Sequence, residues 1–233
     1  MRRSSRLGLR PLSEIAEAGL HCFTQRGFRL TQMSDIGAEL GMSPSAAYRY
    51  VESKEALFHI AALHAAGTPL GGLPLPVAVS DLAETVLSIE AIVHSWPRWP
   101  ALRAALDHPS PVYSLEHEAE GIATELYDFL AATWRLIVLF DRTANDIPSL
   151  KTAFTQQYRA PYLADIVTWF GRRYDGDGPA EALARSGIEA ISWLAMRRRT
   201  DPAAASITEE EARRAAARCL IALLQAPQRR PAM

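Results

Sequence analysis

Residues 41–57 ("GMSPSAAYRYVESKEAL") carry side chains suited to binding rather than to packing. Tyr48, Arg49 and Lys54 each combine a long reach with a hydroxyl or charged tip, and such groups donate hydrogen bonds to phosphates and base edges. Ser43 and Pro44 precede them and predict a helix start, because serine caps a helix N-terminus and proline suits the first turn. The stretch therefore predicts a short helix that recognises a polyanion.

A helix-turn-helix pattern surrounds this stretch. Helices are expected over residues 32–40 and 44–50, and Gly41 lies where the chain must turn sharply with a positive φ. Gly37 is small at the point where the two helices would approach most closely. An ordinary αα-hairpin in a helical core is the alternative interpretation. The residues expected to share the small core are Ile36, Leu40, Met42, Ala47 and Tyr50.

The rest of the chain is also helical in pattern. Apolar residues recur at i, i+3, i+4 and i+7 while two-residue alternation is almost absent, so we expect an all-α fold. The segment 67–80 is rich in Gly and Pro and is interpreted as a linker or flexible surface loop between two regions. We therefore expect a three-helix, helix-turn-helix DNA-binding domain over 1–60 and an all-helical domain over 61–233. Further helices are expected over 11–26, 54–67, 81–95, 99–107, 113–131, 134–144, 148–173, 179–199 and 208–225, the last with a capping box from Thr208 to Glu211.

The N-terminal end of the second helix of such a pair points into the major groove of DNA. Ser45 and Ala46 are small enough to let the backbone approach base edges, and the Ala46 methyl suits a thymine methyl. Thr31 is expected to bond a phosphate through its hydroxyl, and Tyr50 is expected to divide its role between packing and binding. The expected DNA-binding residues are Thr31, Ser43, Pro44, Ser45, Ala46, Tyr48, Arg49, Tyr50 and Lys54.

Over about residues 10–60 the sequence resembles the tetracycline-repressor (TetR) family of bacterial transcriptional regulators. Ala47 stands where leucine is frequent in the family, Val51 where phenylalanine is, Ser45 where glycine is, and Gly37 where alanine is. The resemblance implies a DNA-binding regulator, usually a repressor, whose second helical domain binds a small effector. The matching residues are Ile15, Ala18, Phe23, Gly27, Phe28, Asp35, Ile36, Leu40, Gly41, Ser43, Pro44, Tyr48, Arg49, Tyr50, Ser53, Lys54, Glu55 and Leu57.

One helix-turn-helix reads only a few base pairs, so we expect a homodimer on an inverted-repeat operator, with two copies roughly 34–36 Å apart in successive major grooves. The helices over 179–199 and 208–225 are the candidates for the dimer contact, and the resemblance implies a four-helix bundle of two helices per subunit. The alternative is that their apolar stripes face only the core of their own subunit. The stripes are Leu183, Gly187, Ala190, Ile191 and Leu194, and Ala212, Ala216, Cys219, Leu220 and Leu223.

The resemblance also implies an apolar effector pocket among the middle helices, which are rich in aromatic residues. We expect ligand binding to favour a conformer whose two helix-turn-helix motifs no longer match successive grooves. The effector itself is not identified. The expected pocket residues are Trp96, Trp99, Tyr127, Trp134, Phe154, Tyr158 and Tyr162.

Composition and motifs bound the remaining possibilities. The chain has 233 residues, 48% hydrophobic and 22% charged, with a net charge of −1, so any attraction to DNA must be local. We expect a cytoplasmic protein without a membrane span, because no stretch approaches the roughly 18 apolar residues that a span needs. We also expect no cofactor and no metal site, since Cys22 and Cys219 match no metal or redox spacing. We found no catalytic motif. A helical scaffold or co-regulator without DNA binding, or an unrecognised enzyme, remain the alternatives.

Overall fold

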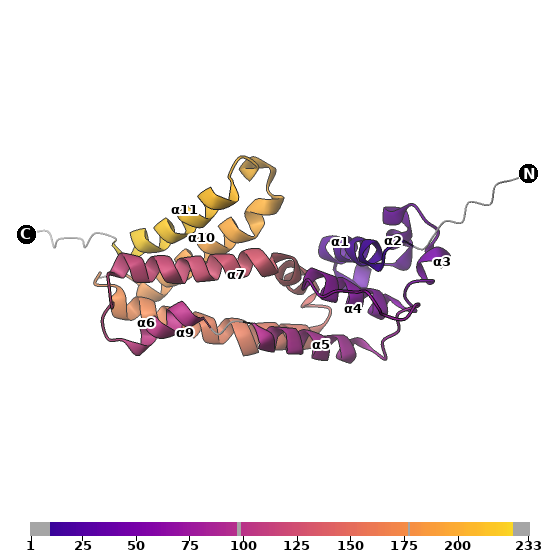
Figure 1. The fold of residues 1–233 in the computed structure, drawn as a ribbon, viewed down its shortest axis with the longest axis horizontal. Helices are drawn as coiled ribbons and strands as arrows, with labels where there is room; N and C mark the ends of the chain where they lie inside the picture. Colours follow the sequence, from indigo (N-terminus) through magenta and orange to yellow (C-terminus); the bar gives the residue numbers. More distant parts are fainter. Residues whose placement is uncertain (1–9, 97–98, 177, 226–233) are drawn as a thin grey trace, which may run out of the picture. The chain divides into compact units, whose positions relative to one another are not determined.

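The computed structural model describes residues 10–96, 99–176 and 178–225, and these form an all-α fold (Figure 1). The fold class predicted from the apolar periodicity is therefore confirmed. The described residues contain no strand, and one isolated parallel bridge joins Val51 to Val77. The α-helices are α1 (Leu12–Leu30), α2 (Met33–Leu40), α3 (Pro44–Ala47), α4 (Lys54–Ala65), α5 (Leu82–Ser95), α6 (Pro100–Asp107), α7 (Leu115–Thr143), α8 (Pro148–Lys151), α9 (Ala160–Arg173), α10 (Ala180–Ala195) and α11 (Glu209–Leu224).

The chain forms two compact units, each with its own core. Unit 1 comprises residues 10–95 and 135–155. Unit 2 comprises the described residues within 96–134 and 156–225. Helix α7 contributes to both units. The domains predicted over 1–60 and 61–233 stay a prediction, and the two compact units divide the chain at other positions.

Several predicted helix boundaries were wrong. Helix α1 ends at Leu30 rather than at 26, α3 ends at Ala47 rather than at 50, and two longer segments are divided differently. The helices expected over 113–131 and 134–144 form the single helix α7, since neither glycine nor proline interrupts the chain between them. The helix expected over 148–173 is divided into α8, a π-helical stretch Thr152–Arg159 and α9. The π-helical stretch ends at Arg159, two residues before Pro161. Proline has no N–H to donate to a preceding carbonyl.

Glycines shape the helix-turn-helix as predicted. Gly41 ends α2 in the left-handed conformation, with φ of 61°. A Cβ on Gly37 would lie 2.8 Å from the carbonyl oxygen of Met42, so α2 and the following turn approach too closely for any other residue. Gly27, with φ of 80°, ends the regular part of α1 where the sequence predicts a stop. Only glycine adopts these positive φ values without strain.

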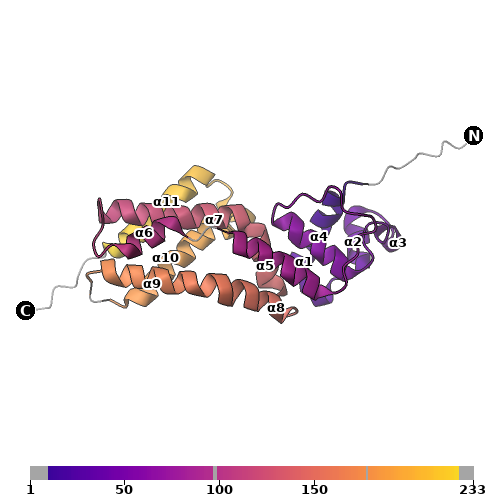
Figure 2. The same ribbon diagram turned by 60° about the horizontal axis from the view of Figure 1, so that its bottom comes forward.

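The core of the helix-turn-helix region is aromatic. The rings of Phe23, Phe28 and Phe58 pack together, with centroids 5.2 to 5.8 Å apart, and join α1 to α4. Gly19 lets these helices approach, because its Cβ position lies 3.0 Å from the Leu57 side chain. Ser53 caps α4 as predicted and accepts a hydrogen bond from the N–H of Ala56 at 3.1 Å. Helices α1 to α4 gather around this core in both ribbon views (Figures 1 and 2).

The segment 67–80 is a loop whose residues are mostly exposed, as its Gly and Pro content predicts, but two of its side chains are buried. Leu70 and Val77 are buried, at 8% and 4% exposure. The N–H of Val77 donates to the carbonyl of Tyr50 at 2.8 Å, and the N–H of Glu52 donates to the carbonyl of Val77 at 2.9 Å. Tertiary hydrogen bonds therefore order a segment that local propensity leaves irregular.

In unit 2 a buried ion pair ties the last turn of α9 to the start of α7. The side chain of Arg173 is 3% exposed and its Nε lies 2.7 Å from the carboxylate of Glu118. The same guanidinium donates to the carbonyl oxygens of Ala105, His108 and Pro109. These contacts satisfy a charge whose burial would otherwise be unfavourable.

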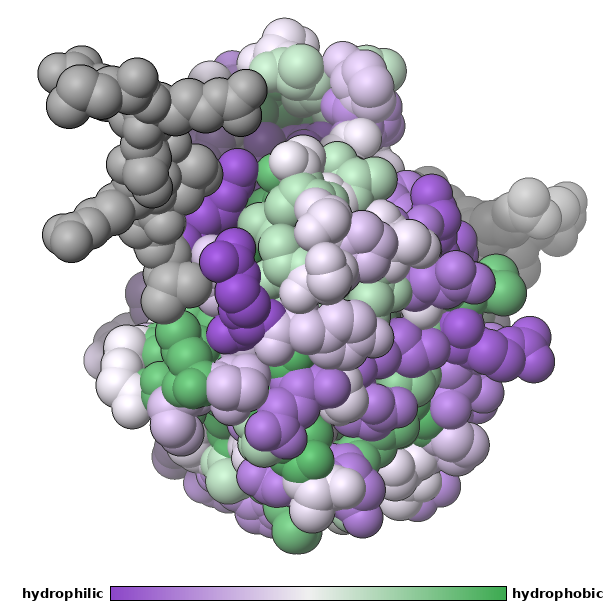
Figure 3. Space-filling view, turned by 90° about the vertical axis from the view of Figure 1, so that its right-hand side faces the viewer, coloured by the Kyte–Doolittle hydropathy of each residue, from purple (hydrophilic) through white to green (hydrophobic). Residues whose placement is uncertain are grey.

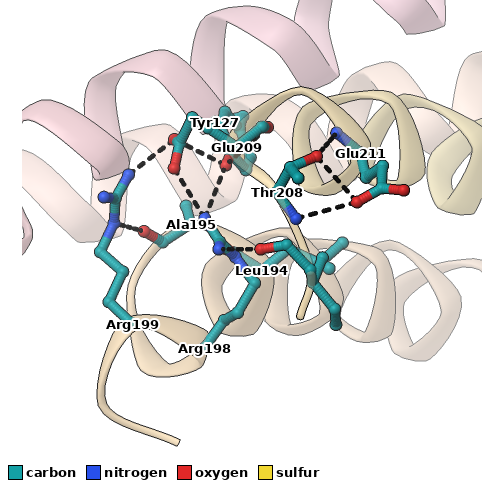
Figure 4. Close-up of polar contacts among 9 residues, drawn as sticks. Tyr127, Leu194, Ala195, Arg198, Arg199, Thr208, Glu209 and Glu211 are labelled. Atoms are coloured by element: carbon teal, nitrogen blue, oxygen red, sulfur yellow. Dashed lines mark hydrogen bonds and ion pairs between the residues drawn. The ribbon is translucent and has the colours of Figure 1, made fainter. Parts of the chain in front are cut away.

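A second polar network joins α10, α11 and α7 (Figure 4). Arg198 and Arg199, just after α10, bond the carboxylate of Glu209 at 2.7 and 2.6 Å, and the hydroxyl of Tyr127 donates to it at 2.8 Å. The predicted capping box of α11 is also confirmed, since Thr208 and Glu211 bond each other's backbone N–H. The network holds the corner between the last two helices.

The apolar stripes of α10 and α11 pack largely against their own chain. Gly187 approaches α11 so closely that a Cβ would lie 3.1 Å from the side chains of Leu220 and Leu223. Ile191 and Ala216 are fully buried within the chain. Any contact with a second copy must therefore use the residues of these helices that remain partly exposed.

Candidate nucleic-acid interface

Helix α3 presents one face to solvent and buries the other. Ser43, Pro44, Ser45 and Arg49 are exposed, and Ala46 is half-exposed. Tyr48 lies just beyond the helix with 48% of its surface exposed. The helix is shorter than predicted, ending at Ala47, and a tight turn with i to i+3 hydrogen bonds covers residues 48–50. Small, hydroxyl and guanidinium groups thus lie together at its N-terminal and outer surface.

Ser43 occupies the predicted N-cap position of α3 without making the expected capping bond. No side-chain hydrogen bond reaches the backbone of α3, and the Ser43 hydroxyl instead lies 3.0 Å from the hydroxyl of Ser45. The four residues of α3 are therefore held mainly by their neighbours, because so short a helix has little stability of its own.

The structure contradicts the expected phosphate contact of the Thr31 hydroxyl. Thr31 is 1% exposed, and its hydroxyl donates to the carbonyl oxygens of Gly27 and Cys22 at 2.7 and 3.3 Å. The residue closes the end of α1 rather than the start of α2. Tyr50 is likewise buried, at 2% exposure, and its hydroxyl accepts a hydrogen bond from the N–H of Arg10 at 2.9 Å. Tyr50 was expected both to pack and to bind DNA, and its burial agrees with the packing role alone.

Lys54 already has partners within unit 1. Its ammonium donates to the carbonyl of Phe28 at 3.1 Å and lies 4.5 Å from the centroid of the Phe28 ring. The carbonyl of Arg29 lies 3.5 Å away. A cation at the C-terminal end of α1 is favourable to the helix dipole. Lys54 remains half-exposed, so a phosphate contact from it stays a prediction.

The start of α2 adds polar groups that the sequence prediction missed. Gln32 and Asp35 form a reciprocal capping box there, and Gln32 and Ser34 are exposed. The signal was present in the spacing of Gln32 and Asp35, since Glu, Gln or Asp three residues after a polar residue is typical of a helix start. Viewed toward this end of unit 1, hydrophilic side chains are spread among pale and apolar ones (Figure 3).

Unit 2 holds a cluster of five aromatic rings. Trp96, Trp99, Tyr158 and Tyr162 were predicted together, and the structure adds Phe129 from α7. Centroid distances include 4.2 Å between Trp99 and Tyr162, 4.9 Å between Trp96 and Tyr158, 5.0 Å between Trp96 and Phe129, and 4.8 Å between Trp99 and Phe129.

Two features of this aromatic cluster are energetically unfavourable. The hydroxyl of Tyr162 is buried and has no hydrogen-bond partner among the described residues. Burial, together with the negative charge of Glu125, raises the pKa of Tyr162 well above its usual value, so the phenol stays protonated. Trp99 adopts a left-handed backbone conformation, with φ of 59°. Each feature costs of order 1–3 kcal/mol.

The other predicted pocket residues lie elsewhere. Tyr127 points into the corner of α10 and α11, where its hydroxyl bonds Glu209. Phe154 packs against Phe140 within unit 1, with ring centroids 5.6 Å apart. Trp134 is half-exposed on α7. The aromatic cluster is therefore smaller than the predicted pocket set.

The described residues contain no helix long and apolar enough to cross a bilayer. They also bring together no group of three or more His, Cys, Asp and Glu side chains suited to a metal ion.

Comparisons with known proteins concern mainly the N-terminal region. Residues 15–61 match the family model described as bacterial regulatory proteins, tetR family. No curated protein matches the sequence. Solved structures with a similar chain include a TetR-family regulator from Mesorhizobium loti MAFF303099, with 19% identity, 96% of this chain and 98% of that chain covered and a TM-score of 0.44. A TetR-like regulator from Rhodococcus sp. RHA1 has 18% identity, coverage of 94% and 100%, and a TM-score of 0.46. The TetR-family regulator PfmR from Thermus thermophilus has 14% identity, coverage of 92% and 99%, and a TM-score of 0.49.

The family match coincides with α1 to α4, the elements that present the exposed face of α3. These proteins are regulators of transcription, not enzymes. The N-terminal helix-turn-helix region, over residues 15–61, is thus similar to the bacterial regulatory proteins of the tetR family.

Proposed function

We propose that this protein is a dimeric transcriptional regulator that binds an inverted-repeat operator through α3 and is released from it by a small effector. Repression is the mode we favour, because it is the usual mode of the family. The exposure of Ser43, Ser45, Tyr48 and Arg49 on one surface, opposite the buried Ala47, is the observation that carries the proposal. These groups suit base edges and phosphates.

Dimerisation is proposed through the partly exposed residues of α10 and α11. Leu183, Ala190 and Trp193 follow the spacing of one face of α10 and remain at least partly exposed. Trp193 is 37% exposed, and contact with a second copy would bury the rest of this large apolar ring. On α11 the partly exposed residues on one face are Ala215, Cys219, Ala222 and Leu223.

The aromatic cluster is the proposed effector site. A small apolar or aromatic molecule with one hydrogen-bond acceptor would gain ring contacts and would satisfy the buried hydroxyl of Tyr162. Trp99 could exchange its unfavourable backbone conformation for another when the ligand binds. Binding would then favour a conformer with lower operator affinity.

Selection of bound duplexes from a random pool tests DNA binding directly. The proposal expects an inverted repeat whose two halves lie about one helical turn, or a multiple of it, apart. Binding should also weaken steeply with salt, because phosphate contacts release counterions. A pool that yields no enriched duplex at low salt would contradict the proposal and would favour the scaffold or co-regulator alternative.

Tyr162→Phe tests the effector site once a ligand has been found by screening small aromatic molecules against the protein. The variant should lower ligand affinity by about 1–2 kcal/mol, because the ligand acceptor loses its donor. Operator affinity without ligand should stay unchanged. The matched control is Tyr113→Phe, since Tyr113 is 84% exposed and belongs to no part of the aromatic cluster. Equal effects of both variants would place the ligand elsewhere.

A further inference from the structure

The backbone of Val77 forms a bridge with the residues that follow α3. The carbonyl of Tyr50 and the N–H of Glu52 lie beyond the end of the helix, so they need partners outside it. Val77 supplies both, at 2.8 and 2.9 Å. Val51, between the two bonded residues, is fully buried, and Val77 is 4% exposed. The bridge is thus a packed, fully hydrogen-bonded contact rather than a passing approach.

The chain that carries this bridge, residues 74–80, is here called the strap. Its C-terminal end is fixed because Ser80 bonds the carboxylate of Glu84 at 2.9 Å through its N–H, and Asp81 accepts from the N–H of Ala83 at 2.8 Å. Helix α5 begins directly afterwards, at Leu82. The strap therefore joins α5 to the end of α3 by a route that does not pass through α4.

Two sets of contacts determine the orientation of α3: its packing on α2, where a Cβ on Gly37 would lie 3.2 Å from the backbone nitrogen of Pro44, and the contacts that flank the helix. The helix has four residues, and its N-cap serine makes no capping bond to the backbone. On the other side of the turn, the Tyr50 hydroxyl accepts the N–H of Arg10. Because so short a helix cannot maintain its own geometry, the flanking contacts act together with the packing on α2 to determine how Tyr48 and Arg49 are presented.

We propose that the strap positions α3 for duplex binding, with Val77 as the positioning residue. This inference rests on the proposed DNA-binding function of α3. Residues 67–80 carry no charged side chain, so the strap is not expected to hold phosphates itself. Its effect is indirect: it keeps the backbone of residues 50–52 in place and so limits the angles from which Tyr48 and Arg49 can approach a base pair.

Two pairs of variants in the full-length protein separate positioning from general packing. Val77→Pro removes the N–H that Tyr50 accepts, and Val77→Ala removes the packing against Val51 while keeping both backbone bonds. Val79→Pro and Val79→Ala are the matched controls, because Val79 lies in the same strap, is only half-buried, and its N–H donates to no described residue.

The measurements are the affinity for the duplex that the wild type selects, the melting temperature, and amide hydrogen exchange at residues 49–52. Val77→Pro should lower duplex affinity about tenfold and Val77→Ala about threefold. Val79 variants should stay within twofold of the wild type. Exchange at Tyr50 to Glu52 should become faster in Val77→Pro, while exchange at Leu57 in α4 should not change.

Three outcomes would overturn the inference. One is wild-type affinity in Val77→Pro together with unchanged exchange at Glu52. Another is an equal loss of affinity in Val77 and Val79 variants. The third is a rise in exchange that includes Leu57, since this would show general unfolding rather than lost positioning. If the wild type selects no duplex, the proposed function fails, and the exchange at Glu52 still decides whether Val77 holds this turn.

Discussion

Arg49 and Lys54 are the two cations of the stretch that follows Gly41, yet the structure gives them different surroundings. Arg49 is exposed beside α3, whereas Lys54 contacts the Phe28 ring and the carbonyl oxygens that end α1. The first side chain is therefore available for a base or phosphate at no cost to the fold. The second stabilises the domain whether or not DNA is present.

We expect Arg49→Ala to weaken specific duplex binding by about 1–3 kcal/mol if its contact is a bidentate one, with no change in melting temperature. Lys54→Ala should lower the free energy of unfolding by about 1 kcal/mol, because a cation–π contact and a helix-end contact are lost. Duplex titration and thermal denaturation of both variants measure the two effects. Wild-type affinity in Arg49→Ala would remove this residue from the interface.

His59 predicts a pH dependence of stability. It is 9% exposed, and its Nδ1 lies 3.1 Å from the hydroxyl of Thr85, which links α4 to α5. Burial lowers the pKa of His59, and the nearby Glu84 opposes this only in part. A lowered pKa means that His59 binds a proton more readily in the unfolded chain than in the folded protein. The contribution of neutral His59 to the free energy of unfolding is therefore complete above about pH 6.5 and is lost as the pH falls through the folded-state pKa.

Thermal denaturation between about pH 5 and 7.5 should therefore show a loss of stability on acidification that is smaller in His59→Gln. His94→Gln is the control, because His94 lies on α5 but is exposed. An acid loss that is the same in the wild type and His59→Gln would assign the effect to other groups.

At the scale of the element, helix propensity and packing have opposite effects on a side chain at position 37 in α2. Alanine should favour α2 by about 1 kcal/mol in propensity alone. A Cβ at this position would lie 2.8 Å from the Met42 carbonyl, however, so the backbone of the turn would have to move. The close approach explains why glycine suits this position despite its low helix propensity.

We expect Gly37→Ala to destabilise the protein by about 1–3 kcal/mol, because overpacking outweighs propensity. Gly121→Ala in α7 should have the opposite sign and stabilise by roughly 0.5–1 kcal/mol, since its Cβ position meets only an ordinary contact at 3.9 Å. Urea denaturation of both variants measures the difference. Stabilisation by both substitutions would show that α2 and its turn can separate.

At the scale of the whole molecule, the proposed function depends on a second copy. The stripes that suggested dimerisation are mainly buried within one chain, where α10 packs on α11. The proposed dimer face keeps the partly exposed residues of the predicted stripes, such as Leu183 and Leu223, and adds Trp193 beside them.

Trp193→Glu should shift the protein from dimer to monomer, because a carboxylate in a helix–helix interface is costly to bury. Light scattering over a range of concentrations measures the mass directly. Tyr113→Glu, on an exposed side chain outside α10 and α11, should leave the mass unchanged. A wild type that is monomeric at micromolar concentration, or a Trp193→Glu variant that stays dimeric, would contradict this face.

The sequence by itself determined the features that depend on a few neighbouring residues. Apolar periodicity predicted the all-α class, Gly41 predicted the end of α2, and the capping residues Ser53 and Thr208 predicted two helix starts. These predictions succeeded because propensity, capping and positive φ act within one or two turns of chain. Gly27, predicted to end the first helix, instead interrupts α1, which continues to Leu30.

Only the tertiary structure decided which side chains of the predicted interface are free. Thr31, Tyr50 and Lys54 were predicted from position, but hydrogen bonds and ring contacts from distant parts of unit 1 occupy them. The bridge of Val77 to the end of α3 was likewise invisible in a segment rich in Gly and Pro. Such contacts join residues far apart in the chain, and no local pattern encodes which polar group will meet which.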